Sequence, residues 1–162
     1  MKLGRYAEAG PLFKRVLATA EKVYGSEHAR VAGTLNNVAN VNRLLGGYSE
    51  AEMQFKRALT IQERIYGSDH PEVALSLTNL ASIYKDLGRN EEAESYYRRA
   101  LAVQVRSLGD HHLDVAQSLA NLAALYVSID RISPALDLSR RSTEIALASS
   151  QINLRRVRAT AG

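Results

Sequence analysis

One spacing recurs along the chain: Gly25, Gly67 and Gly109 lie 42 residues apart. When residues 25–66 are aligned with residues 67–108, 18 of the 42 positions are identical. Two unrelated segments of ordinary composition would share roughly two or three. The chain is therefore a tandem repeat, and arrays of this kind stack units that cannot bury their apolar faces alone.

Each unit contains two runs of apolar residues at the three- and four-residue spacing of a helix. In residues 67–108 the first run ends at Gly88 and the second ends before Gly109, and glycine suits a helix C-cap in the left-handed conformation. Asp69 followed by Pro71 predicts a capped helix start. The two runs consist of Val73, Leu77, Leu80, Ala81 and Tyr84, then Ala93, Tyr96, Tyr97, Ala100, Leu101 and Val103.

Small residues recur where the two helices of a unit should cross, as at Ala39, Ala51 and Ala58. Alanine lets helix axes approach closely, so each unit should be an antiparallel helix pair. The predicted fold is all-α, a right-handed superhelix of about seven antiparallel helices. We expect a half repeat at residues 3–24, full repeats at 25–66, 67–108 and 109–150, and a basic tail at 151–162.

The residues carry a resemblance to a known repeat. The run Leu77, Leu80-Ala81, Tyr84, Gly88, Ala93, Tyr97 and Ala100 is similar to the tetratricopeptide-repeat signature. The longer period, with Gly-Ser-Asp-His-Pro-Glu-Val-Ala at 67–74 and Leu-Asn-Asn-Val-Ala at 35–39, resembles the kinesin-light-chain type of that repeat. This resemblance implies a helical solenoid whose first helices line a concave surface that binds protein segments.

Some positions depart from the repeat pattern. Asn42 stands where the next unit has Tyr84, so packing should differ locally in the first full unit. In the last unit Asp130 replaces the glycine found at Gly88, and Ser139 replaces a large aromatic residue. These polar replacements are typical of a capping repeat at the end of an array.

Composition narrows the classes of function. The chain has no cysteine, no long apolar run and no leader-like start, so we expect a soluble, cytoplasmic protein without a membrane span. The formal charge of +4 is concentrated at Arg155, Arg156 and Arg158, which leaves the repeats nearly neutral. Lysines and arginines within the repeats alternate with glutamates, as on a solvated helix face with local ion pairs. We therefore expect no nucleic-acid partner.

Residues that could carry chemistry occur in the turns. His28, His70 and His112 repeat with the 42-residue period, so they occupy separated corners of successive units and cannot share a metal ion. Ser68, Asp69 and His70 are the residue types of a catalytic triad, but three consecutive turn residues do not converge in space. We expect no catalytic residue, no metal and no cofactor.

The in-register asparagines Asn37, Asn79 and Asn121 are the strongest binding candidates. Each lies on the first helix of its unit, and an amide can donate to and accept from the main chain of an extended peptide. The alternative is that these amides bond to neighbouring helices. With their neighbours on the same faces, the predicted peptide-binding set is Asn37, Asn40, Arg43, Thr78, Asn79, Ser82, Lys85 and Asn121; Asn36 lies beside it.

The predicted function is a non-catalytic protein-protein interaction module that binds a peptide or partner segment in the concave groove. The kinesin-light-chain resemblance implies an internal segment with acidic flanks, for which Arg43 and Lys85 supply positive charge and Asp86 partly cancels it. An alternative is a regulatory array of a larger protein whose effector domain, an enzyme or a transcription regulator, is missing here. RNA binding would need a basic groove, which the neutral repeats do not offer.

Residues 6–23 match the second helix of a unit without its first helix. Part of the apolar face formed by Tyr6, Ala9, Phe13, Val16 and Leu17 should then lack an intramolecular cover. A neighbouring copy is the simplest cover, so we expect a homodimer through residues 6–23. In a longer parent protein an upstream helix would replace that copy.

Overall fold

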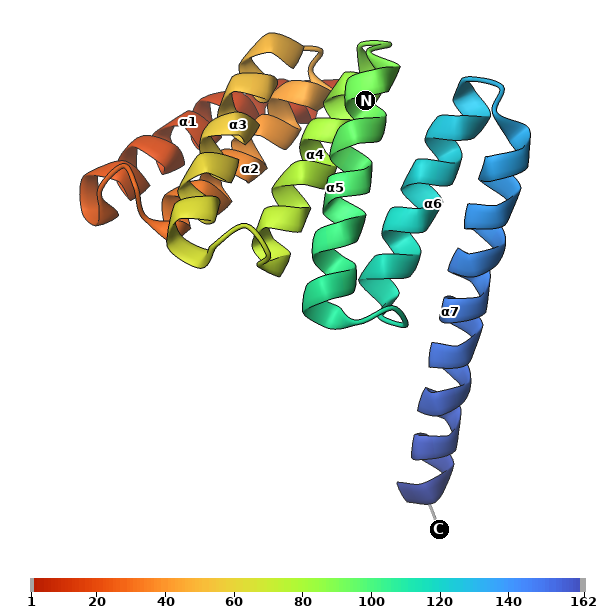
Figure 1. The fold of residues 1–162 in the computed structure, drawn as a ribbon. Coiled ribbons are helices and arrows are strands. Elements are labelled where there is room, and N and C mark those ends of the chain that lie inside the picture. The colour runs from red at the N-terminus through yellow and green to blue at the C-terminus, as the bar shows by residue number, and fades with distance from the viewer. Residues whose placement is uncertain (1, 161–162) are drawn as a thin grey trace.

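The computed structural model describes the backbone of residues 2–160 and the side chains of residues 11–151, and in this range it contains seven helices and no strand (Figure 1). The helices are α1 (Lys2–Tyr24), α2 (Ala29–Leu44), α3 (Tyr48–Tyr66), α4 (Pro71–Asp86), α5 (Asn90–Leu108), α6 (Leu113–Ser128) and α7 (Ile132–Thr160).

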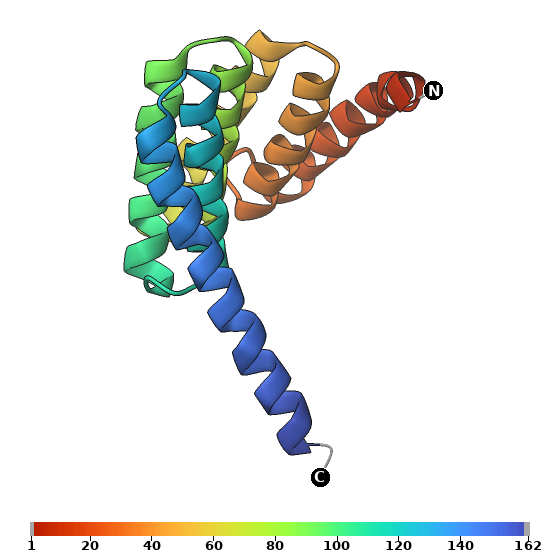
Figure 2. The same ribbon diagram turned by 90° about the vertical axis from the view of Figure 1, so that its right-hand side faces the viewer.

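The helices form the predicted antiparallel pairs. Helices α2 and α3, α4 and α5, and α6 and α7 are joined by short turns and pack along their lengths, and successive pairs stack side by side (Figures 1 and 2). Helix α1 packs on α2, and α2 also contacts α4, the first helix of the next pair. The prediction of an all-α superhelix of helical repeats is confirmed.

Histidines start the first helix of each full unit. The Nδ1 atoms of His28, His70 and His112 accept hydrogen bonds from the backbone two residues later, at 3.1 Å, 3.2 Å and 3.2 Å. The prediction of turn residues at helix starts is confirmed for these histidines. The prediction that Asp69 caps α4 is wrong, because His70 is the N-cap and Asp69 instead accepts a bond from Arg106.

The break between the helices of a pair requires a left-handed backbone. Gly88 adopts a φ of 72° there, and Asp130 adopts 59° at the equivalent position of the last unit. Aspartate tolerates this conformation better than most residues, so the turn survives the loss of glycine. The last unit therefore has the same turn as the other units, although its residue at this position is not glycine.

The alanine positions form the helix crossings. Ala39, Ala51 and Ala58 have no exposed surface, and Phe55 beside them is also fully buried. The equivalent residues Ala81, Ala93 and Ala100 of the next unit are buried in the same way. The prediction that these alanines belong to the core is confirmed.

A polar cluster joins each of the later units to the one before it. The Tyr84 hydroxyl donates to Glu52 Oε1 at 2.8 Å, and Glu52 also pairs with Lys56 and with Arg89. The Arg89 guanidinium lies 4.5 Å from the centre of the Tyr84 ring. The same cluster recurs 42 residues later, with Tyr126, Glu94, Arg98 and Arg131.

The first junction is built from different residues. Asn42, Gly47 and Gly10 stand at the positions equivalent to Tyr84, Arg89 and Glu52. Asn42 donates to Gln54 within its own helix pair, so packing differs locally as predicted. The junction between α1 and the first full unit therefore cannot form the tyrosine-glutamate bond of the later junctions.

Ion pairs extend beyond single helices. Besides the i,i+4 pairs that the sequence predicts, arginines on the second helices reach across to acidic residues of the preceding unit or turn. These longer pairs are Arg57 with Glu21, Arg64 with Glu27, Arg99 with Glu63, Arg106 with Asp69 and Arg141 with Asp110.

Helix α7 continues from Ile132 to Thr160 without a break, so the backbone of residues 151–160 extends it beyond the end of α6 (Figures 1 and 2). In the part of the chain that the structure describes, no helix combines the length and the apolar character needed to cross a bilayer.

The outward face of α1 differs in detail from the expectation. Val16 is 52% exposed, whereas Phe13 and Leu17 are half-buried, and Leu17 packs against the core formed with α2. The side chains of Tyr6 and Ala9 lie outside the described residues. Among the described side chains of α1, the large apolar ones that are exposed are the expected Val16 and, in addition, Leu12, Val23 and Tyr24.

Candidate functional site

The first helices of neighbouring units lie side by side and bound a groove. Between α4 and α6 there is a depression of about 290 Å³, with α5 beneath it. Of the predicted peptide-binding residues, it brings together Thr78 and Asn121. The α4–α6 groove is lined by Pro71, Glu72, Leu75, Thr78, Gln104, Asp114, Gln117, Ser118 and Asn121.

The three in-register asparagines remain accessible. Asn37 is exposed, and Asn79 and Asn121 are half-buried. Within the described part of the chain, the side-chain amides of Asn37 and Asn79 form no hydrogen bond, and Asn121 accepts a bond only from Gln117 of its own helix, at 3.1 Å. Each amide therefore keeps donors, and at least one acceptor site, free for a ligand.

The hydroxyl groups of the predicted site are partly occupied. Thr78 donates to the Ala74 carbonyl at 2.9 Å, and Ser82 donates to the Thr78 carbonyl at 3.0 Å. Ser82 also lies 3.1 Å from the Tyr97 hydroxyl. Burial raises the pKa of Tyr97, so this hydroxyl stays protonated at neutral pH. Thr78 and Ser82 can therefore offer a ligand little beyond acceptor lone pairs.

The positive charge predicted for the site is largely paired. Arg43 Nη1 on α2 lies 2.6 Å from Asp86 Oδ2 on α4, and both side chains are about a quarter exposed. Lys85 is half-buried beside this pair, and Asn40 is half-buried on α2. The bridge neutralises Arg43 and ties two first helices together, so Lys85 carries the site's uncompensated positive charge among these residues.

Asn36 does not belong to the accessible surface on which the sequence placed it. It is only 5% exposed and donates to Ser76 of α4 at 2.9 Å, and Ser76 in turn donates to Gln62 of α3. One unit later Ser118 donates to Gln104. Bonding to neighbouring helices, the alternative considered for the asparagine column, thus describes Asn36 and not its neighbour Asn37.

Sequence reasoning missed the charge at one end of the groove. Glu72 and Asp114 line the α4–α6 groove near the starts of α4 and α6, and the described residues of its lining include no lysine or arginine. The signal was present in the sequence, because positions 30, 72 and 114 share one register and read Arg, Glu and Asp. The α4–α6 groove is therefore acidic near the starts of these helices, and Lys85 lies on α4 outside its lining.

The turn residues with triad chemistry have structural partners. Asp69 accepts a bond from Arg106, and the His70 ring stacks on Tyr66 with 4.4 Å between ring centres. Among the described residues, no three His, Asp or Glu side chains come together in a way that could hold a metal ion.

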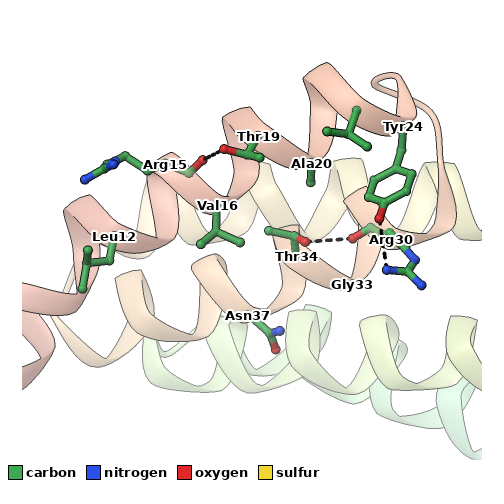
Figure 3. A pocket seen from close by; sticks show the side chains of 11 residues that line it. Leu12, Arg15, Val16, Thr19, Ala20, Tyr24, Arg30, Gly33, Thr34 and Asn37 are labelled. Atoms are coloured by element: carbon green, nitrogen blue, oxygen red, sulfur yellow. Dashed lines mark hydrogen bonds between the residues drawn. The ribbon is translucent and has the colours of Figure 1, made fainter.

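A larger depression lies along the junction between α1 and α2. This α1–α2 cleft has a volume of about 760 Å³, and seven of its eleven lining residues come from α1, among them the apolar Leu12, Val16 and Ala20 (Figure 3). Asn37 lies on its α2 side, at the border with the other first helices (Figure 3). The cleft is lined by Leu12, Arg15, Val16, Thr19, Ala20, Val23, Tyr24, Arg30, Gly33, Thr34 and Asn37.

Comparison with protein families gives a match over nearly the whole chain. The model of the family described as Tetratricopeptide repeat matches residues 1–64, 30–104 and 72–148. None of the curated proteins matches the chain.

Solved structures with the same fold include BtubC (BKLC) from P. vanneervenii, with a TM-score of 0.82 and 25% identity over 91% of this chain. The chain spans 59% of the length of that protein. A putative kinesin light chain with nearly identical TPR-like repeats from Podosopora anserina gives a TM-score of 0.74 and 25% identity, with 90% of this chain and 69% of that chain covered. The apo form of RapI shares the fold at 20% identity, with a TM-score of 0.76, over 91% of this chain and 52% of that one.

Proposed function

We propose a function from one premise: the chain belongs to the tetratricopeptide-repeat family, of the kinesin-light-chain type. Repeats of this family form protein-interaction modules. We infer that this chain binds an extended peptide or partner segment across the first helices α2, α4 and α6. The observation that carries the proposal is the accessible column of Asn37, Asn79 and Asn121, whose amides keep free hydrogen-bonding groups.

The amide column suits an extended main chain. One asparagine per unit presents a donor and an acceptor at a regular interval, and a peptide backbone offers both groups in every residue. Such contacts give affinity without dependence on the peptide's side chains. Side-chain preference would come from the exposed Leu75, which offers an apolar contact in the α4–α6 groove.

The charge distribution favours one peptide direction. Lys85 would attract an acidic flank of a peptide that extends beyond the groove toward the Arg43–Asp86 bridge, whereas Glu72 and Asp114 would repel it at the other end. A ligand with one acidic flank therefore fits better than a ligand with acid on both sides. The sequence predicts a peptide with acidic residues on its flanks, and the charges of the site favour such residues at only one end of the peptide.

The chain acts in this proposal by holding its partner, without catalysis, cofactor or nucleic acid, and in the cytoplasm. The regulatory array with a separate effector domain remains a prediction of the sequence. The peptide-binding role is compatible with it, because an array that regulates an effector also needs a ligand site.

The test uses peptides selected from a random library displayed on phage, followed by titration of the free peptides. Replacing Asn79 by Ala should weaken binding by roughly 5- to 30-fold, the equivalent of about 1–2 kcal/mol for a lost contact in a desolvated site. Asn90→Ala, at the start of α5 and away from the groove, is the matched control and should bind as the unmodified chain does.

Circular dichroism should show the same helix content in all three proteins. Unchanged affinity in the folded Asn79→Ala variant would remove the main support for the proposal.

A further inference from the structure

The α1–α2 cleft is an apolar surface that the peptide-binding proposal does not use. Its α1 wall presents Leu12, Val16 and Val23, which are 58%, 52% and 64% exposed. Single exposed apolar residues are common on proteins, but here they line one depression together with Ala20 (Figure 3). The α1 wall of the cleft therefore offers apolar surface to a partner.

Comparison of α1 with the equivalent helices of the later units indicates that a helix would fill the cleft. Val16 and Thr19 are equivalent to Ala58 and Ile61 of α3, which are buried in a common core with Val31 of α2. In the following unit the equivalent residues Ala100 and Val103 of α5 are buried against α4 in the same way. The positions that open into the cleft are thus the positions on which a helix lies in the first two full units.

We propose that a second copy of this chain fills the cleft, with the α1 helices of the two copies packed against each other. Helix α1 carries Leu12, Val16 and Val23 at helical spacing, so the element that forms the cleft also has the shape and chemistry of its occupant. A twofold interface requires such self-complementarity, because one patch must serve as both partners.

The charges on the rim of the cleft predict how self-association depends on salt. Arg15 and Arg30 line the cleft, and the described residues of its lining include no aspartate or glutamate. Twofold packing brings these like charges together, and salt screens their repulsion. Self-association should therefore become stronger as the ionic strength rises, whereas association driven by opposite charges would become weaker.

The interface leaves most of the peptide site open. Asn37 lies on the border of the cleft, but Asn79 and Asn121 lie on α4 and α6, beyond α2. Dimerisation and peptide binding are separate claims, and Asn79→Ala should not alter the dimer.

Sedimentation equilibrium tests the proposal. At high concentration the unmodified chain should approach twice its 17.8 kDa mass. Val16→Glu should weaken the dimer by at least about tenfold, because a carboxylate would be buried in an apolar contact. Val127→Glu on α6 is the matched control, because Val127 is 58% exposed and lies away from the cleft. Circular dichroism shows whether each variant is folded.

A second measurement does not depend on the stability of the glutamate variant. The chain has no cysteine, so Val16→Cys introduces a single thiol, which should form a disulfide-linked dimer under mild oxidation faster than Val127→Cys does. An unmodified chain that stays monomeric at high concentration, and cross-linking no faster than the control, would overturn the proposal. The cleft would then accept a different helix or remain open.

Discussion

Asn42 Nδ2 lies 2.9 Å from Oε1 of Gln54, and both side chains are buried between α2 and α3. One unit later the equivalent residues are Tyr84 and Tyr96, whose rings stack with 5.2 Å between their centres. A hydrogen bond in the first full unit is thus replaced by an aromatic contact in the second. Both residues of the pair differ between the two units.

The Asn42–Gln54 pair gives a stability prediction. Asn42→Ala leaves the buried Gln54 oxygen without a donor and should lower the free energy of unfolding by about 1–3 kcal/mol. Replacing both residues by tyrosine, as in the following unit, should cost less than the sum of the two single tyrosine changes, because the rings can stack. Urea denaturation of the two single variants and the double variant measures the coupling; additive losses would contradict it.

The serine between the units gives a second stability prediction. Ser76→Ala leaves both Asn36 and Gln62 without their buried partner and should cost about 1–3 kcal/mol. Ser118→Ala should cost less, because only Gln104 loses a bond and that residue is half-buried, so water can replace the serine. Thermal unfolding of both variants gives the order, and an equal loss would argue against the three-residue network.

The glutamate of the first tyrosine cluster predicts a dependence on pH. The hydrogen bond from Lys56, helped by that from Tyr84, lowers the pKa of Glu52 below its ordinary value of 4.5 despite the opposing effect of burial. A lowered pKa in the folded state means that the stabilisation is complete above pH 4.5 and disappears as the pH falls through the lowered value.

Calorimetry between about pH 7 and about pH 3 should therefore show a smaller loss of Tm on acidification in Glu52→Gln than in the unmodified chain. Glu91→Gln, at an exposed position in the first turn of α5, should follow the unmodified curve. Parallel curves for Glu52→Gln and the unmodified chain would show that Glu52 does not contribute to acid sensitivity.

The Arg43–Asp86 bridge predicts how peptide charge is recognised. Asp86→Asn frees Arg43 and should raise the affinity for peptides with an acidic flank several-fold at low salt, with little change for neutral peptides. Titrations of both peptide classes with the unmodified and variant chains test this. An equal gain for neutral peptides would mean that Asp86 acts through packing and not through charge.

The repeat register made most of the fold predictable from the sequence. The alanine crossings, the glycine break at Gly88 and the histidine positions all follow from local rules that repeat in every unit. The cap of α4 was misassigned because aspartate and histidine adjoin before Pro71, and aspartate is the commoner cap. A choice between neighbouring residues depends on backbone geometry that the pattern alone does not contain.

The candidate site was less predictable, because exposure depends on contacts between units. Asn36 and Asn37 are adjacent and chemically identical, yet only Asn36 faces Ser76, 40 residues away in the chain. The pairing of Arg43 with Asp86 likewise depends on the distance between two first helices. Side-chain type gave the candidates, and the stacking of the units determined which of them are free.

The different residues at the junction between α1 and the first full unit affect where the array opens by local unfolding. In a linear stack each unit is held only by its neighbours, so opening should begin at a junction that lacks the tyrosine-glutamate bond. Amide hydrogens of α2 should then exchange faster than those of α4, where Tyr84 and Arg89 link the unit to Glu52. Local unfolding would therefore be more frequent at the α1–α2 end of the array. A ligand held on α4 and α6 would bind the part of the array that opens less often.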